Sequence, residues 1–198
     1  MDKFSSLKMK EDKVQKDSFK YKNDDFEVID YDESDIILSK DEMVILPYLK
    51  DDGFILMKYE KIPAFSYKYK DISSYKSSAN YFLGCIKGFI NEGDTDTQNV
   101  RTILYEQTGL VLSTNVSIEV DKVLFKTDKN VGQYKFCILH LSYNDYKQTS
   151  LKTHNEQSDP DKIRVIKVSL GDLDEIRSYD LVTDYMLLKL KQEINIKF

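Results

Sequence analysis

The chain has 198 residues, of which 41% are apolar, and this is enough for one well-buried core of α/β type. Charged residues of both signs are interspersed along the sequence, and the net charge is only -5. A nucleic-acid-binding protein usually has a basic excess or a basic stripe, so this composition argues against that class. No apolar run is long enough to span a bilayer, and residues 1–13 lack the apolar centre of a signal peptide. We therefore expect a cytoplasmic protein with neither a nucleic acid nor a membrane as its partner.

Neither thiols nor imidazoles suggest a metal or redox site. Cys85 and Cys137 lie within apolar, strand-like runs, where small buried thiols are common. His140 and His154 have no short spacing to either cysteine, so the ligand pattern of a zinc site is missing. We interpret both cysteines as reduced core residues and His140 as a structural or outward-facing side chain.

The N-terminal 25 residues differ in composition from the rest of the chain. They contain many Lys, Asp and Ser residues and too few apolar positions to offset the entropy cost of ordering the backbone. The sequence therefore predicts a flexible arm at 1–25, followed by one domain at 26–198. The arm is either a solvated tail or a segment that becomes ordered on a partner.

Short β-prone runs follow the arm and predict strands at 26–31, 35–38, 42–49 and 54–59. A tight turn is expected at 51–53, Asp-Asp-Gly, because Asp and Gly tolerate positive φ. The next stretch, 66–80, predicts a long exposed loop. Its tyrosines Tyr67, Tyr69 and Tyr75 are either surface residues or a stacking surface for a nucleotide base.

The middle of the chain predicts a strand at 81–88 and a helix at 95–108. The apolar residues Val100, Ile103 and Leu104 recur with helical spacing and define the buried face. Asp94 or Thr95 can cap the start of this helix, and Gly109 stands where a left-handed C-cap is expected.

The second half predicts strands at 116–126 and 134–143, joined by a turn at 129–132. A polar loop at 144–162 leads to a strand at 163–170 and a final helix at 179–194. In that helix the spacing of an apolar face is marked by Leu181, Tyr185, Leu188 and Gln192, and widened by Leu187 and Leu190. The order of β-rich, helical, β-rich and helical segments predicts an α+β domain or a three-layer α/β/α sandwich.

Two glycines and the end of the predicted helix have a specific spacing. Gly88 and Gly93 lie in the segment Gly-Phe-Ile-Asn-Glu-Gly-Asp, and the helix ends in Glu-Gln-Thr-Gly-Leu at 106–110. This segment resembles the Nudix box, the loop, helix and loop that define the Nudix hydrolases. In a match without gaps Asp94 stands at the first glutamate of the box, and Gly109 matches its last glycine.

The resemblance extends from residue 26 to residue 194. The predicted strands and turn at 44–59 and the segment from 163 to 183 are similar to those of ADP-ribose pyrophosphatases. The resemblance implies the Nudix fold, with a mixed β-sheet, the box helix and a C-terminal helix. It also implies a possible homodimer formed through the N-terminal strands, as is common in that subfamily.

The box departs from the family at the positions that bind metal. In Nudix hydrolases three glutamates at i, i+3 and i+4 of the helix lie beside divalent cations that activate a water. Here those positions are Ile103, Glu106 and Gln107. Isoleucine cannot ligate a cation, and glutamine keeps an oxygen but loses the charge. Thr102 replaces the arginine of the box, and Arg101 points about 100° away on a helix.

A metal site could still form from Glu106 with Glu92 or Asp94 and with Asp159 or Asp161 of the polar loop. The sequence therefore leaves two main hypotheses. The favoured one is a catalytically degenerate Nudix protein without a cofactor, which serves as a binding or structural component. The alternative is a divergent pyrophosphohydrolase of ADP-ribose-like nucleoside diphosphates that uses Mg²⁺ or Mn²⁺, with Glu106 as its catalytic residue.

A third hypothesis is a sensor that binds a nucleotide without hydrolysing it. The partner of a non-catalytic protein would be another protein, bound through the N-terminal arm and the long loops, or a second copy of the chain. The abundance of Lys, Asp, Tyr, Ile and Asn, with no Trp and few Gly, is typical of an AT-rich coding sequence from a phage or a low-GC bacterium. A phage origin would make a location in the virion plausible.

Overall fold

The computed structural model describes residues 19–31, 34–61, 81–125, 131–148, 164–176, 178 and 180–195. The chain separates into two compact units. The smaller unit comprises residues up to Lys40 together with Phe125–Gly132, and the larger comprises Asp41–Leu124 together with Gln133–Phe198.

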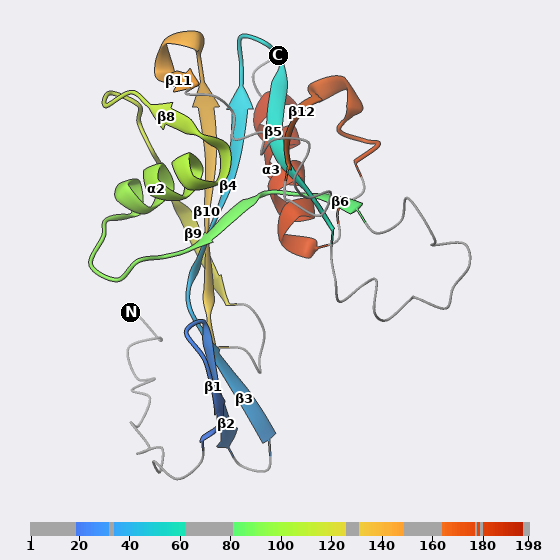
Figure 1. Ribbon diagram of the computed structural model, residues 1–198. Coiled ribbons are helices and arrows are strands. Elements are labelled where there is room, and N and C mark those ends of the chain that lie inside the picture. Colours follow the sequence, from blue (N-terminus) through green and yellow to red (C-terminus); the bar gives the residue numbers. More distant parts are fainter. Residues whose placement is uncertain are drawn as a thin grey trace, which may run out of the picture. The chain divides into compact units, whose positions relative to one another are not determined.

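The smaller unit contains an antiparallel sheet in the order β1-β2-β3 (Figure 1). Its strands are β1 (Phe19–Lys22), β2 (Phe26–Tyr31) and β3 (Ser34–Ser39). Asn23 closes the β1–β2 turn, because its Oδ1 accepts hydrogen bonds of 2.8 Å from the backbone N–H groups of Asp25 and Phe26. The predicted arm thus includes a strand near its end. Residues 1–18 lie outside the described residues, and the division into arm and domain stays a prediction.

The larger unit is built on a mixed sheet with the path β12-β5-β4-β10-β9, in which β6 also pairs with β5 and β7 with β4. β10 runs parallel to β4, whereas β5 and β7 run antiparallel to it. The bounds are β4 (Glu42–Leu49), β5 (Phe54–Lys61), β6 (Tyr81–Gly84), β7 (Ile86–Phe89), β9 (Asp121–Phe125), β10 (Gln133–Leu141) and β12 (Arg164–Ser169).

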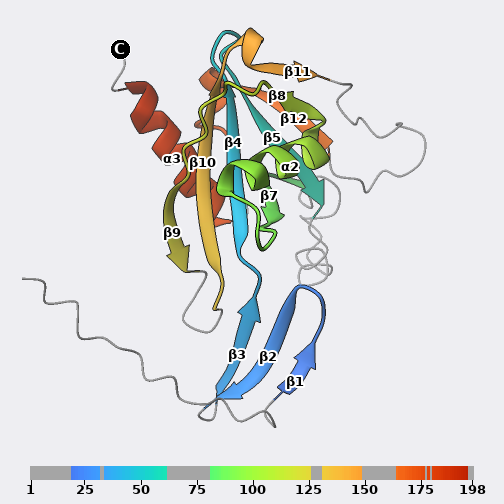
Figure 2. The ribbon, with the colours of Figure 1, turned by 90° about the vertical axis from the view of Figure 1, so that its left-hand side faces the viewer.

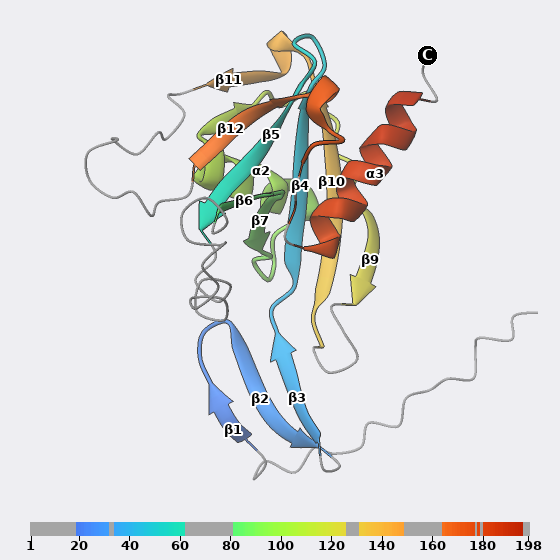
Figure 3. The ribbon, with the colours of Figure 1, turned by 90° about the vertical axis from the view of Figure 1, so that its right-hand side faces the viewer.

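Two helices cover opposite faces of this sheet, α2 (Asp96–Thr108) and α3 (Leu181–Asn195), as Figures 2 and 3 show. The central strand β4 is buried on both faces because successive side chains alternate. Met43 and Ile45 pack in the cluster that contains the apolar face of α2, whereas Val44 and Leu46 pack with α3. The layers are therefore helix, sheet and helix, as predicted.

Several predicted boundaries were wrong. The strand expected at 81–88 is two strands, and the one expected at 116–126 begins only at Asp121. A short sheet of β8 (Leu110–Leu112) and β11 (Tyr146–Gln148) was missed, as were the 3-10 turns η3 (Tyr143–Asp145) and η4 (Leu170–Asp172). The polar loop expected at 144–162 thus begins with structured residues. Most of that loop, and the loop expected at 66–80, lie outside the described residues.

The predicted apolar face of α3 was right at Leu187 and Leu190 but wrong at Leu181 and Leu188. Leu181, Tyr185 and Leu188 are exposed, by 85%, 37% and 56% of their surface. The helix instead packs on the sheet through the face that contains Leu187 and Leu190, together with Thr183 and Met186. Apolar residues occur on both sides of this helix, so their spacing does not identify the buried side; contact with the sheet decides it.

The strands β6 and β7 separate at Cys85, where the chain changes from pairing with β5 to pairing with β4. The first turn of α3 holds this fork. The backbone N–H of Cys85 donates a hydrogen bond of 3.0 Å to Oγ1 of Thr183, a residue that is fully buried. Asp180 caps the same turn, since its Oδ1 accepts a 2.7 Å hydrogen bond from the backbone N–H of Thr183.

We expect Thr183→Val to lower the free energy of unfolding by about 1 kcal/mol, because the buried N–H of Cys85 then loses its acceptor while the side-chain shape is retained. Urea denaturation measures this loss. The exposed threonine at position 114 supplies the matched control, and Thr114→Val should change stability by less than about 0.5 kcal/mol. Equal effects of the two substitutions would contradict the role of the Thr183 hydroxyl.

Both cysteines are free thiols in the core, as predicted. Burial raises the pKa of Cys85 and that of Cys137 to about 12, so both remain protonated near neutral pH. Because the thiolate is the reactive species, we expect a thiol-reactive disulfide reagent at pH 8 to label the native protein at least about 100-fold more slowly than the urea-unfolded chain. Rapid labelling of the native protein would contradict this burial.

No helix within the described ranges is long and apolar enough to cross a membrane.

Candidate functional site

The helix of the predicted box, α2, has the expected caps. Thr95 is the N-cap: its hydroxyl accepts from the N–H of Gln98, and Oε1 of Gln98 accepts a 2.8 Å hydrogen bond from the N–H of Thr95. At the other end Gly109 adopts a φ of 75° and donates its N–H to the carbonyl of Tyr105 at 2.8 Å. The local sequence therefore sets both ends of this helix.

Asn99 secures the loop that precedes α2, and the sequence analysis missed this residue. Its side chain is fully buried. Its Oδ1 accepts a 2.8 Å hydrogen bond from the N–H of Asn91, and its Nδ2 donates to the carbonyls of Asp94 and Thr95 at 3.4 and 3.2 Å. A buried amide whose groups are all bonded fixes the loop against the helix. The sequence did contain a sign of this role, because Asn99 is a polar residue one turn after the start of the helix, beside the apolar residues of its buried face.

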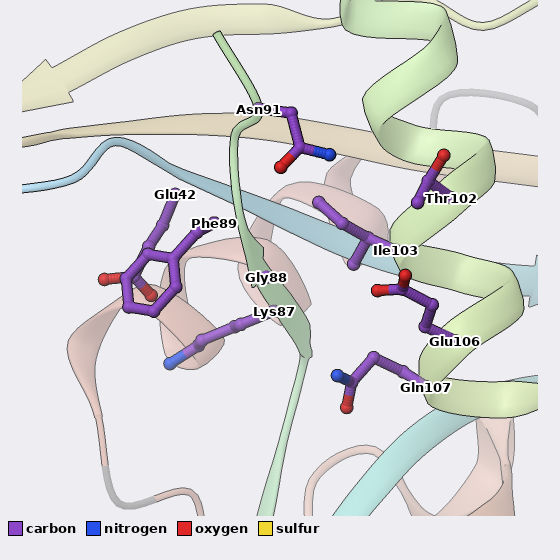
Figure 4. A pocket seen from close by; sticks show the side chains of 9 residues that line it. All are labelled: Glu42, Lys87, Gly88, Phe89, Asn91, Thr102, Ile103, Glu106 and Gln107. Atoms are coloured by element: carbon purple, nitrogen blue, oxygen red, sulfur yellow. The ribbon is translucent and has the colours of Figure 1, made fainter. Parts of the chain in front are cut away.

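The side chain of Ile103 on α2 packs against β7. The side chain is 4% exposed and belongs to the core cluster on that side of the sheet. A Cβ atom on Gly88 would lie only 2.8 Å from both Cγ1 and Cγ2 of Ile103, so the contact needs a glycine. Figure 4 shows Ile103 directed from the helix toward the strand at Gly88. Position 103, which the resemblance aligns with a metal-ligand glutamate, is thus a packing position in this structure.

A cavity of about 390 Å³ lies beside this contact. From α2, Glu106 and Gln107 point toward β7, and on the other side of Gly88 lie side chains of β7 and β4 (Figure 4). The complete lining is Glu42, Lys87, Gly88, Phe89, Asn91, Thr102, Ile103, Glu106 and Gln107. The residues predicted for the box helix therefore do meet at one cavity.

Two charged side chains of the lining, Lys87 and Glu106, differ in whether they have an ionic partner. Nζ of Lys87 lies 2.7 Å from Oδ2 of Asp180, and both side chains are less than one fifth exposed. In contrast, within the part of the chain that the structure describes, the Glu106 carboxylate has no hydrogen bond or ion pair. The cavity therefore contains an available carboxylate, whereas its lysine already has an anionic partner.

The other predicted metal ligands do not join Glu106. Glu92 and Asp94 are exposed, and neither lines the cavity. Gly93 between them has a φ of 91°, which places both carboxylates in a turn. Among the described residues no three His, Cys, Asp or Glu side chains are grouped so that they could hold a metal ion. Outside the described residues lie the other candidates, Asp159, Asp161, His154, Tyr67, Tyr69 and Tyr75.

Arg101 points away from the cavity, as its position on the helix predicted. Its guanidinium donates hydrogen bonds of 2.9, 3.0 and 3.4 Å to the carbonyls of Leu112, Ser113 and Thr114, in the segment that follows β8. It therefore stabilises that segment and does not replace the arginine of the box.

His140 has the structural environment expected for it. Its Nε2 lies 2.8 Å from Oε2 of Glu193 on α3, and its ring meets that of Tyr48 edge-on at 5.5 Å. These contacts join β10 and β4 to α3.

A comparison of the sequence with protein-family models and with curated proteins found no match. Solved structures are similar to the chain. One, described as a crystal structure of an ADP compounds hydrolase, is 14% identical, has a TM-score of 0.59, and matches over 89% of this chain and 90% of its own. Another, a MutT structure from a study of Aliivibrio salmonicida and Vibrio cholerae, is 13% identical with a TM-score of 0.48, over 76% of this chain and 98% of its own.

The first of these likenesses confirms the predicted fold class. The chain has the Nudix fold, an α/β/α sandwich in which a mixed sheet lies between α2 and the C-terminal helix α3.

Proposed function

We propose that this protein is a catalytically inactive member of the Nudix-fold proteins and acts as a binding or structural component. The observation that carries the proposal is the contact of Ile103 with Gly88, which fills with a core side chain the place where the box helix of an active enzyme presents a carboxylate. An apolar residue that is required for packing is not available for metal binding.

The donor set at the cavity does not suit a divalent cation. Mg²⁺ and Mn²⁺ prefer several oxygen ligands with negative charge, and hydrolysis of a phosphoanhydride needs such an ion to neutralise charge and activate a water. The helix offers one carboxylate, Glu106, and one neutral amide, Gln107, and the other carboxylate of the lining, Glu42, lies on the opposite side of Gly88. We therefore propose no cofactor for this protein.

A non-catalytic component needs a partner, and we propose another protein or a second copy of the chain. The N-terminal arm and the two long polar segments are the proposed contact surfaces, and most of their residues lie outside the described ranges. Neither a nucleic acid nor a membrane is part of the proposal. A cytoplasmic location is proposed, or a virion location if the protein comes from a phage.

The test is an assay of the full chain with ADP-ribose and NADH in the presence of Mg²⁺ or Mn²⁺. We expect no product above the level of a blank without protein. Product formation that Glu106→Gln abolishes would overturn the proposal. The matched control is Glu175→Gln, which removes the same charge at an exposed site away from the cavity. Turnover that neither substitution changes would identify a contaminating enzyme and leave the proposal standing.

The same assay decides the second candidate function, a divergent pyrophosphohydrolase of ADP-ribose-like compounds. The observation in its favour is the Glu106 carboxylate, which faces the cavity and has no partner among the described residues. This candidate requires Mg²⁺ or Mn²⁺ and further carboxylates, for which Asp159 and Asp161, both outside the described residues, are the remaining candidates. The third candidate, a nucleotide sensor, predicts calorimetrically detectable binding of ADP-ribose without hydrolysis.

A further inference from the structure

We propose that the cavity between α2 and β7 binds a cationic side chain of a protein partner, specifically the guanidinium group of an arginine. The inference rests on the proposed function, since it takes the cavity as a binding site and not as a metal centre. It adds the chemical class of the ligand and the residues that recognise it.

The charge balance of the cavity favours a cation. Three ionisable side chains line it, Glu42, Lys87 and Glu106. The lysine is already paired with Asp180 at 2.7 Å, and this pair is largely shielded from solvent. Glu106, which has no partner among the described residues, therefore gives the α2 side of the lining a negative charge, which attracts a cation and repels a phosphate or a carboxylate.

The position of Glu106 on its helix is an independent observation in the same direction. Glu106 and Gln107 lie in the last turn of α2, where the unpaired carbonyl groups give the helix end a partial negative charge. That turn has no basic residue. A carboxylate there is destabilised unless a cation approaches, so a bound guanidinium would relieve the repulsion as well as form new hydrogen bonds.

A guanidinium suits the available groups better than a metal ion does. It is planar, weakly hydrated and carries five N–H donors, so one carboxylate and one amide oxygen satisfy much of its hydrogen-bonding capacity. Glu106 and Gln107 present those oxygens from adjacent positions. Ile103 forms an apolar wall beside them, against which the methylene groups of an arginine can pack.

The shape of the cavity allows an extended side chain. The lining extends from Glu106 and Gln107 of α2, on one side of Gly88, to Phe89 on the other side, whose surface is 42% exposed. A volume of about 390 Å³ is within the range of small-ligand sites. Because Ile103 fills the space directly beside Gly88, the arginine lies on the α2 side of the cavity, with its guanidinium at Glu106 and Gln107.

The test is a titration of the ¹⁵N-labelled full chain with N-acetyl-arginine amide, followed by the amide resonances of residues 87–91 and 102–107. We expect saturable shifts confined to these residues, with a dissociation constant on the order of 1 to 10 mM, typical of one small group. Glu106→Gln should weaken binding about tenfold, whereas Glu175→Gln should change it less than twofold. The neutral isostere N-acetyl-citrulline amide should cause no saturable shift.

The proposal is overturned if arginine amide causes no saturable shift at the cavity, if citrulline amide binds equally well, or if Glu106→Gln leaves binding unchanged. Both glutamate variants must retain the dispersed spectrum of the folded protein, which the exposed positions of the two side chains lead us to expect. Failure here does not affect the proposed function, which rests on the contact of Ile103 with Gly88 and is tested by the hydrolysis assay. Hydrolysis that depends on Glu106 would overturn the proposed function whatever the titration shows.

Discussion

Replacing Ile103 with glutamate is expected to lower the free energy of unfolding by about 4 kcal/mol or more, because the new carboxylate would be buried without a partner. The site is 4% exposed and is bounded by Gly88 of β7, and Lys87, the basic residue that lines the same cavity, is already paired with Asp180. Equilibrium urea denaturation in buffer with a chelator measures the effect. The substitution restores the residue type of the Nudix box at this position, so the result bears directly on the proposed loss of the metal site.

Two comparisons make the experiment specific. Ile103→Val removes one methyl group and should cost only about 1 kcal/mol, so a large loss with glutamate reflects its charge and not reduced packing alone. Addition of Mn²⁺ should restore little of the stability of Ile103→Glu, because only Glu106 stands beside it on the helix face. If Ile103→Glu were as stable as Ile103→Val without metal, the face would accept a carboxylate and the proposed function would lose its main support.

Gly88→Ala is the second substitution with a large expected effect, a loss of about 2 kcal/mol. The added Cβ would lie 2.8 Å from two atoms of Ile103, which is closer than real contacts of this kind. The backbone of Gly88 does not have positive φ, in contrast to Gly53, Gly93 and Gly109. The cost is therefore steric, and α2 must move away from β7 or Ile103 must change its rotamer.

A double-mutant cycle tests this explanation. Ile103→Ala removes the atoms that collide, so Gly88→Ala should cost at least about 1 kcal/mol less in that background than in the natural chain. Gly171→Ala is the control, since its nearest contact would be an ordinary 3.6 Å to Oγ of Ser169, and we expect a change within about 0.5 kcal/mol. Full additivity of Gly88→Ala and Ile103→Ala would contradict a direct contact between the two positions.

The shape of the cavity depends on the contact between Ile103 and Gly88. Ile103 brings α2 close to the sheet and thereby determines how far Glu106 and Gln107 stand from β7. A glutamate at 103 would push the helix away or draw in an ion, and in both cases would alter the cavity. The contact between Ile103 and Gly88 therefore affects both the packing of the core and the positions of the polar groups in the cavity.

Features set by neighbours along the chain could be predicted from the sequence. The caps of α2 depend on Thr95, Gln98 and Gly109, all within one turn of the helix end, and the strand β4 was predicted to the residue. The spacing of Gly88, Glu106 and Gly109 carried the resemblance from which the fold was predicted. The isoleucine at position 103 was the basis for the hypothesis that a metal ligand is missing.

Features set by partners distant in the sequence were decided only by the tertiary structure. The apolar run at 81–88 gives no sign of the fork at Cys85, because the fork arises when the chain changes strand partners and is held by Thr183, 98 residues away. For the same reason the sequence pattern of α3 placed Leu181 and Leu188 on the buried face, whereas the sheet buries Met186 beside Leu187 and Leu190, which were predicted correctly. Periodicity along a chain describes what a helix can bury, and only the surface packed against it decides what it does bury.

The candidate site divides in the same way. By itself the sequence determined that an isoleucine, a glutamate and a glutamine stand at 103, 106 and 107, since that depends only on residue identity. The tertiary structure decided that Ile103 closes on Gly88, that the loop carboxylates Glu92 and Asp94 lie outside the cavity, and that Asp180 neutralises Lys87. These are distances between separate elements, and the energy of a contact or a charge pair depends on such distances and on burial, which no local pattern contains.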